Sequence, residues 1–104
     1  MIKEELLKNY CVDSLFFNQC IKEHLIQEKD SYTQDDIKKL SQLIDLKKVG
    51  FETKDILYYQ ELLKEEKKAE IVKMFKNQRN KVLKKVHEEE NKLSILDYYI
   101  YKMR

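Results

Sequence analysis

The last third of the chain carries two interleaved rows of mostly apolar residues, each repeating every seven positions. The rows are Val72, Arg79, Val86, Leu93 and Ile100, and Phe75, Val82, Glu89, Leu96 and Met103, so that eight of the ten positions are apolar. This spacing is a heptad seam, the pattern of a helix that packs along a second helix. Because no Gly or Pro follows Lys67, one continuous helix of roughly 55 Å is predicted at a rise of 1.5 Å per residue. Nothing else in the 104 residues is long enough to cover that seam, so the sequence predicts a homodimer.

Arg79 and Glu89 are the two charged residues in these rows. If two copies run antiparallel about a two-fold axis near Lys84, the numbers of facing residues add up to about 168, as in an antiparallel heptad seam. Arg79 of each copy then faces Glu89 of the other. We expect this pair to fix the register and the orientation of the helices, at some cost in stability relative to an apolar pair.

Turn-forming residues are almost absent from the chain, which has one Gly and no Pro, while 38% of its residues are charged. This composition favours an all-α fold with few and short loops. The start, MIKEELLKNY, is too acidic for a signal peptide, and no stretch approaches the roughly 20 apolar residues of a membrane span. We therefore expect a cytoplasmic protein without membrane contact, in which Cys11 and Cys20 stay reduced and act as small buried hydrophobes.

Four short helices are predicted before the long one, because apolar residues recur there at helical spacing. Their expected bounds are 3–9, 13–26, 33–49 and 53–65. We expect residues 1–66 to form one helical lobe and residues 67–104 to form the coiled-coil dimerisation helix.

Asp13, Thr33 and Thr53 are the expected N-caps, since their side-chain oxygens can accept hydrogen bonds from the free backbone N–H groups of a first turn. Gly50 is expected to end the third helix in a left-handed conformation. The expected buried side chains of the second and fourth helices are Leu15, Phe16, Cys20, Leu25 and Ile26, and Ile56, Leu57, Leu62 and Leu63.

A characteristic order of residues runs from the middle of the chain into its tail. It comprises Tyr32-Thr33, Asp35-Asp36-Ile37, Leu40, Leu43-Ile44, Leu46-Lys47-Lys48-Val49-Gly50-Phe51, Thr53 and Asp55-Ile56. This order resembles the third and fourth helices of the MerR family of bacterial transcription regulators, with their Leu-Gly-Phe corner. The tail from Lys76 to Tyr101 is similar to the dimerisation helix of some short members.

The resemblance implies a winged helix-turn-helix over Lys3–Ile26 with a shortened wing at Gln27–Tyr32, followed by an antiparallel coiled coil. Members that sense metals or drugs use cysteines beyond the long helix or an added C-terminal domain. The chain reaches Arg104 with neither, so the resemblance implies no small-molecule effector domain.

The chain departs from the family where members meet DNA. Where the family's recognition helix carries arginines and tyrosines, the matching positions hold Ser14, Asn18, Gln19 and Cys20, and Asp30 stands for the wing arginine. Arginine offers a planar, charged fork for phosphates and guanine, whereas Ser and Asn offer neutral hydrogen bonds and Asp repels phosphate. The charge distribution agrees, because residues 1–46 carry a net charge of −3 and residues 47–104 carry +5.

The candidate DNA-binding residues are polar or basic and lie on the second helix, the expected wing and the third helix: Asn18, Gln19, Lys22, Lys29, Lys38 and Lys39. Asn and Gln can hydrogen-bond adenine in a bidentate manner, and lysines can neutralise phosphates. The alternative interpretation is that these residues form an ordinary solvated surface.

No pattern in the chain indicates catalysis. His24 and His87 are 63 positions apart and have no Ser or Cys nucleophile or metal-ligand spacing beside them, so we expect no enzyme, cofactor or metal site. The tyrosines Tyr58, Tyr59, Tyr98, Tyr99 and Tyr101 suggest either a ligand pocket or, more simply, half-buried packing between two copies.

The sequence thus predicts a homodimeric, MerR-like regulator of transcription that binds double-stranded DNA through two spaced lobes. The alternative is a degenerate protein-interaction module that pairs with another regulator, or antagonises it, without binding DNA itself. The salt dependence of binding separates the two, because affinity for phosphates falls steeply as salt rises.

Overall fold

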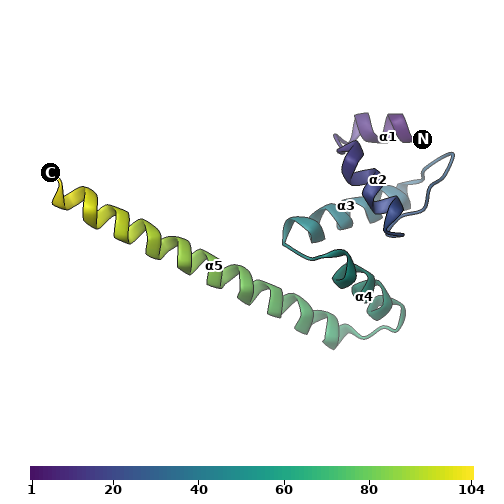
Figure 1. The fold of residues 1–104 in the computed structure, drawn as a ribbon. Coiled ribbons are helices and arrows are strands. Elements are labelled where there is room, and N and C mark those ends of the chain that lie inside the picture. Colours follow the sequence, from purple (N-terminus) through teal and green to yellow (C-terminus); the bar gives the residue numbers. More distant parts are fainter.

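The computed structural model describes all 104 residues as five helices and contains no strand. The helices are α1 (Lys3–Asn9), α2 (Ser14–Lys22), α3 (Gln34–Lys48), α4 (Thr53–Lys64) and α5 (Lys68–Lys102). Figure 1 shows α1 to α4 gathered in a lobe at one end of α5, whose other end projects away as an arm. The radius of gyration is 19.2 Å, against about 13 Å for a compact chain of this length. The prediction of an all-helical chain with one long C-terminal helix is confirmed.

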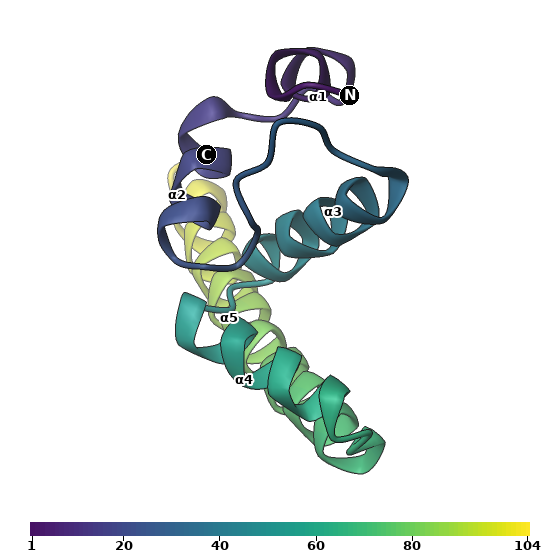
Figure 2. The same ribbon diagram turned by 90° about the vertical axis from the view of Figure 1, so that its right-hand side faces the viewer.

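The lobe has a single hydrophobic core that joins all four short helices. Its buried members are Leu6, Phe17, Cys20, Leu25, Ile26, Tyr32, Leu40, Leu43, Leu46, Phe51 and Ile56. Figure 2 shows α1, α2 and α3 grouped together, with α4 lying along the beginning of α5. Two residues of α5, Met74 and Phe75, pack against the same core. The first turns of the arm therefore belong to the packing of the lobe.

Two of the three predicted N-caps are confirmed. The carboxylate of Asp13 accepts a hydrogen bond from the Leu15 amide at 3.0 Å, and Thr33 forms a reciprocal capping box with Asp36. Thr53 is not the N-cap. It is the first residue of α4, and the N-cap is Glu52, one position earlier. The Asp55 carboxylate accepts from the Glu52 amide at 3.0 Å, which fixes this start.

Each of the four short helices is followed, two positions after its last residue, by a residue with positive φ. These residues are Cys11 (52°), His24 (62°), Gly50 (99°) and Glu66 (56°). At the end of α3, the Gly50 amide donates to the carbonyl of Lys47 and the Phe51 amide to that of Leu46, both at 3.1 Å. This is the Schellman arrangement, and it also occurs at the other three ends. Only Gly50 could be predicted, since glycine alone adopts this conformation without cost.

The second helix is shorter than predicted, because α2 ends at Lys22 and the left-handed His24 turns the chain. Leu25 and Ile26 are buried as predicted, but they enter the core after the helix has ended. The following segment, residues 27–32, where the resemblance implied a wing, forms an irregular loop without a strand. The backbone amide of Tyr32 donates to the carbonyl of Met1 at 2.6 Å, which ties this loop to the start of the chain.

Several predicted core residues are exposed instead. Leu15 is 78% exposed, while Phe17, two positions on, is fully buried. The reason is helical geometry: Phe17 and Cys20 define the inner side of α2, and Leu15 lies about 160° around the helix from Phe17 at 100° per residue. Leu57 and Leu63 likewise lie on the outer side of α4, with 40% and 47% exposure.

The two cysteines differ. Cys11, predicted to be buried, is exposed because it forms the left-handed turn after α1, whereas Cys20 is buried as predicted. Burial raises the pKa of the Cys20 thiol. That change disfavours the reactive thiolate, which is consistent with a packing role for Cys20.

Candidate functional site

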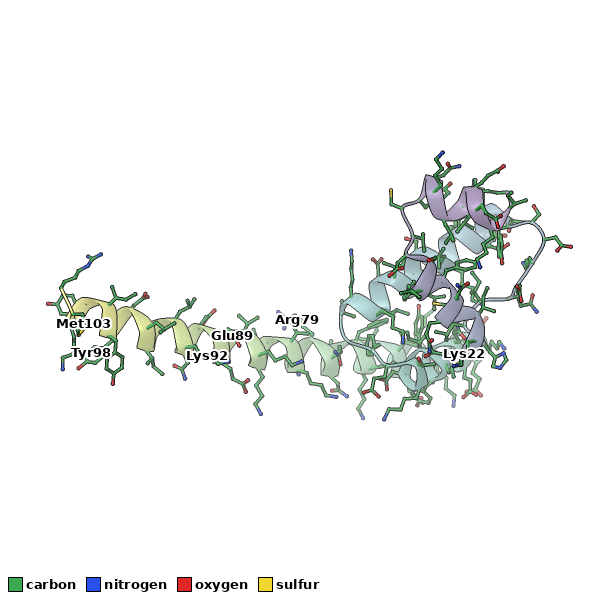
Figure 3. The ribbon with its side chains drawn as sticks, turned by 45° about the horizontal axis from the view of Figure 1, so that its top comes forward. Lys22, Arg79, Glu89, Lys92, Tyr98 and Met103 are labelled. Carbon is green, nitrogen blue, oxygen red and sulfur yellow. The ribbon has the colours of Figure 1, made fainter.

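The residues of α2 that were predicted to meet DNA are exposed but already engaged within the lobe. The amide oxygen of Asn18 accepts a hydrogen bond from the Lys3 ammonium at 2.7 Å, and the Gln19 amide donates to the Glu23 carboxylate at 2.7 Å. Lys22 lies on the lobe, at the opposite end of the molecule from Met103 (Figure 3). Reading a base with Asn18 or Gln19 would require these bonds to break first.

The remaining three candidates lie on separate parts of the lobe. Lys29 pairs with the Asp36 carboxylate at 2.9 Å. The pKa of Asp36 is lowered, first by the hydrogen bond from the Thr33 amide and then by Lys29. Lys38 and Lys39 are both exposed on α3, and Lys39 lines a groove of about 410 Å³ between α3 and α4. No hydrogen bond joins any two of the six candidate residues.

A polar network that the sequence did not predict joins α2 to the corner between α3 and α4. The Glu23 carboxylate accepts a hydrogen bond from the Thr53 hydroxyl at 2.5 Å and lies 3.8 Å from the Lys47 ammonium. Lys47 also donates to the Thr53 hydroxyl at 3.0 Å. The pKa of Glu23 is lowered, first by the hydrogen bond from Thr53 and next by that from Gln19. This network fixes the end of α2 against the corner.

The arm carries the largest unpartnered apolar surface of the molecule. Eleven of the nineteen exposed large hydrophobic side chains lie on α5 and a twelfth, Met103, directly follows it, while α5 has no buried residue. The predicted seam residues Val72, Val82, Val86, Leu93, Leu96, Ile100 and Met103 are all at least 43% exposed. Figure 3 shows Arg79 and Glu89 in the middle of the arm and Tyr98 and Met103 at its tip. An apolar surface of this extent is typical of a site of protein association.

Phe75, the remaining apolar seam residue, makes its contacts within the chain. Its ring packs edge-to-face on Phe51, with the centroids 5.7 Å apart, and on Tyr59, with the centroids 5.5 Å apart. One turn later, the Gln78 amide donates to the carbonyl of Val49 at 2.7 Å. These contacts hold α5 against the corner between α3 and α4. We call this junction the elbow, and define it by Val49, Gly50, Phe51, Phe75 and Gln78.

Gly50 has a second role at the elbow that the sequence did not reveal. A Cβ atom on Gly50 would lie 2.8 Å from the Gln78 amide nitrogen, so the end of the Gln78 side chain would have to shift. The same residue therefore ends α3 and leaves room for the side chain of Gln78. Only the first role has a local signal, because Gln78 is 28 positions further along the chain.

A shallow hollow of about 260 Å³ adjoins the elbow. Phe51 and Phe75 line it together with Val49, Gln78, Arg79 and Val82. Arg79 and Val82 belong to the predicted seam, so the hollow and the seam are continuous. The apolar surface available to a partner helix thus includes part of the lobe.

The geometry of the chain also bears on two further kinds of feature, metal-binding clusters and membrane-spanning helices. No group of three or more His, Cys, Asp or Glu side chains is close enough together to hold a metal ion. None of the helices has both the length and the apolar character needed to cross a membrane. No family model, curated protein or solved structure matches the chain.

Proposed function

We propose that the chain is a MerR-like DNA-binding transcription regulator that acts as a homodimer joined by antiparallel α5 helices. The observation that carries the proposal is the exposed heptad seam, which runs from the elbow to the tip of the arm without one buried residue. A helix of 35 residues with such a seam is stable in water when a second helix covers it.

The charges on the arm favour antiparallel packing. In a parallel pair in register, Arg79 would face Arg79 and Glu89 would face Glu89, and like charges at such positions repel. In the antiparallel pair about Lys84, Arg79 faces Glu89 twice. On one flank of the same seam, Lys76 then lies near Glu90 of the second copy, and Leu83 meets Leu83 at the axis.

The hollow beside the elbow fits the same arrangement. In the antiparallel register, Leu93 of the second copy faces Phe75, which lines the hollow with Phe51. Leu93 is 60% exposed in the single chain, so entering the hollow would remove its side chain from water. The seam and the hollow are thereby covered by one partner.

The dimer would carry two lobes at a separation suited to DNA. Each lobe is attached to α5 around Met74 and Phe75, so a two-fold axis at Lys84 places the two attachment points about 30 Å apart at 1.5 Å per residue. Adjacent major grooves on one side of a duplex are about 34–36 Å apart. The spacing supports binding of an inverted repeat.

The first experiment tests the dimer. Light scattering should give the mass of two chains for the unaltered protein and of one chain, or a mixture of states, for Arg79→Glu, because that change places two carboxylates opposite each other. The charge-reversed double variant Arg79→Glu with Glu89→Arg should regain the dimer. If Arg79→Glu leaves the mass and sedimentation unchanged, the proposed register is wrong.

The second experiment tests DNA binding, by gel shift with the duplex upstream of the protein's own gene at two salt concentrations. A regulator should bind with an affinity that falls steeply as salt rises. The alternative, a protein-interaction module without DNA affinity, is favoured by the internal hydrogen bonds of Asn18 and Gln19. It predicts no shift of the duplex and a stable complex with another regulator.

A further inference from the structure

An open groove of about 810 Å³ is lined by residues of the corner between α3 and α4 and by residues from the middle of α5. Its walls carry five lysines, Lys48 and Lys54 from the lobe and Lys81, Lys84 and Lys85 from the arm. Four of them make no ion pair and no side-chain hydrogen bond; the exception is Lys54, which lies 3.6 Å from the Glu52 carboxylate. The groove therefore presents ammonium groups that the chain itself leaves unpaired.

The carboxylates in the groove do not offset these charges. Glu52 is the partner of Lys54. Asp55, which accepts the hydrogen bond from the Glu52 amide, and Glu88 are the two carboxylates on the groove wall without a cationic partner. Four unpaired ammonium groups against two such carboxylates leave an excess of positive charge, which makes the groove a binding surface for anions.

In the proposed dimer the two grooves open on the same side. A two-fold axis perpendicular to antiparallel helices keeps the same flank of each helix on one face of the pair. On the flank that includes the groove, Lys85 of one copy lies beside Lys85 of the other, and Lys81 follows one turn away. Like charges at this position repel each other unless an anion lies between them. The opposite flank holds Leu83 and the complementary pair of Lys76 and Glu90.

We propose that this pair of grooves binds the phosphate backbone of duplex DNA between the two half-sites. The inference rests on the proposed function and assigns the sequence-independent part of the affinity to the elbow and the arm instead of α2. Lysine suits this role, because it attracts phosphates as a point charge and needs no bidentate geometry. A duplex also presents an unbroken line of charges, about one per 1.7 Å of axis, that can follow the basic flank from one copy to the other.

The first part of the lobe supports this assignment by contrast. Residues 1–46, which include the whole of α1 and α2, carry a net charge of −3. Of the lysines predicted there as phosphate contacts, Lys29 is held by Asp36, and the others lie on separate parts of the surface. The groove brings four unpaired lysines together on one surface.

The test is a fluorescence anisotropy titration with the duplex upstream of the protein's own gene and with an unrelated duplex of the same length. The groove variant is Lys81→Gln with Lys84→Gln and Lys85→Gln. The control variant is Lys8→Gln with Lys68→Gln and Lys102→Gln, which removes the same charge from exposed positions outside the groove. Circular dichroism and light scattering establish that each variant remains a helical dimer.

We expect the groove variant to bind both duplexes at least about tenfold more weakly at about 50 mM salt. Its slope of log affinity against log salt should be shallower by about 2 or more, because each lost phosphate contact removes about 0.9 and every contact occurs twice. The control variant should change the slope by less than about 1. Lys48→Gln with Lys54→Gln alters the lobe wall alone and should reduce the slope in the same direction, which a weakened coiled coil would not explain.

The outcomes separate the inference from the proposed function. No binding of either duplex by the unaltered protein at low salt overturns the regulator proposal and this inference with it. The inference is overturned, and the regulator proposal is left standing, if the unaltered protein binds DNA and the salt slope is unchanged both in the groove variant and in Lys48→Gln with Lys54→Gln. A second titration uses a poly-glutamate peptide in place of DNA. If the groove variant loses binding to this peptide but keeps its affinity for DNA, the groove is assigned to an acidic protein and the inference is overturned.

Discussion

The lobe and the arm are both helical, but they differ in whether their apolar side chains are buried. All twelve buried residues lie between Leu6 and Leu62, in a lobe that completes its own core. The arm has eight apolar seam positions and buries none of them. The difference shows that a regular helical segment need not bury its own apolar residues: the lobe covers its apolar side chains within one chain, and the arm leaves those of its seam exposed.

Removing one large side chain from each region tests this difference and should have the largest effect. Phe17→Ala should lower the free energy of unfolding by about 3–5 kcal/mol, because Phe17 is fully buried and the cavity left behind is not refilled. Leu96→Ala should cost the single chain less than about 1 kcal/mol, since Leu96 is 59% exposed. Urea denaturation at low protein concentration measures both. Equal losses would mean that the arm is as self-sufficient as the lobe.

Gly50→Ala tests the elbow, where the two regions meet. The left-handed φ of 99° should cost an alanine about 1–3 kcal/mol, while the flexible Gln78 side chain can move aside at little further cost. Thermal unfolding of this variant measures the total. Adding Gln78→Ala removes the close approach together with the hydrogen bond to Val49, so the double variant should be no more stable than Gly50→Ala. A recovery of stability would show that the close approach is the larger part of the cost.

The polar network of Glu23 should make the stability of the lobe depend on pH. Because its pKa is lowered in the folded state, the Glu23 carboxylate stabilises the fold above its unfolded pKa of about 4.3. That contribution is lost as the pH falls through the folded pKa. Glu23→Gln should cost about 1 kcal/mol at neutral pH and flatten the decline in stability below about pH 4.3. An unaltered pH profile of thermal unfolding in this variant would exclude Glu23 as its source.

His24→Gly should give the smallest effect and the opposite sign. His24 has the same left-handed role after α2 that Gly50 has after α3, and its exposed side chain makes no hydrogen bond. Relief of its backbone strain should raise the free energy of unfolding by about 0.5–1 kcal/mol, a few degrees in Tm. A loss of stability would mean that the imidazole packs usefully against the groove between α3 and α4.

The sequence was informative wherever the determinant is local. The heptad rows predicted the arm, while Asp13, Thr33 and Gly50 predicted two helix starts and one helix end that the structure confirms. It failed where a residue type disguised its conformation. His24 resembles an ordinary helical residue, so nothing local indicated that α2 ends at Lys22. Leu15 was predicted to be buried, but Phe17, two positions later, is the buried residue.

The candidate site was less predictable, because its contacts join residues far apart in the chain. Glu23 meets Thr53 across 30 positions, and Gln78 meets Val49 across 29. Periodicity identifies which face of a helix is apolar, but not which distant backbone oxygen a glutamine will reach. The DNA-binding residues and the dimer seam stay predictions, since the contacts that define them lie between molecules.

The hydrogen bond between Gln78 and Val49 has a consequence for the proposed DNA-binding dimer. Because this bond and the packing of Phe75 on Phe51 hold the lobe against α5, the number of residues along α5 would set the distance between the two lobes. Inserting one heptad beside Lys84 would preserve the seam and lengthen that distance by about 10 Å, or about three base pairs of duplex. A change of binding-site spacing would then require no alteration of the lobe at all.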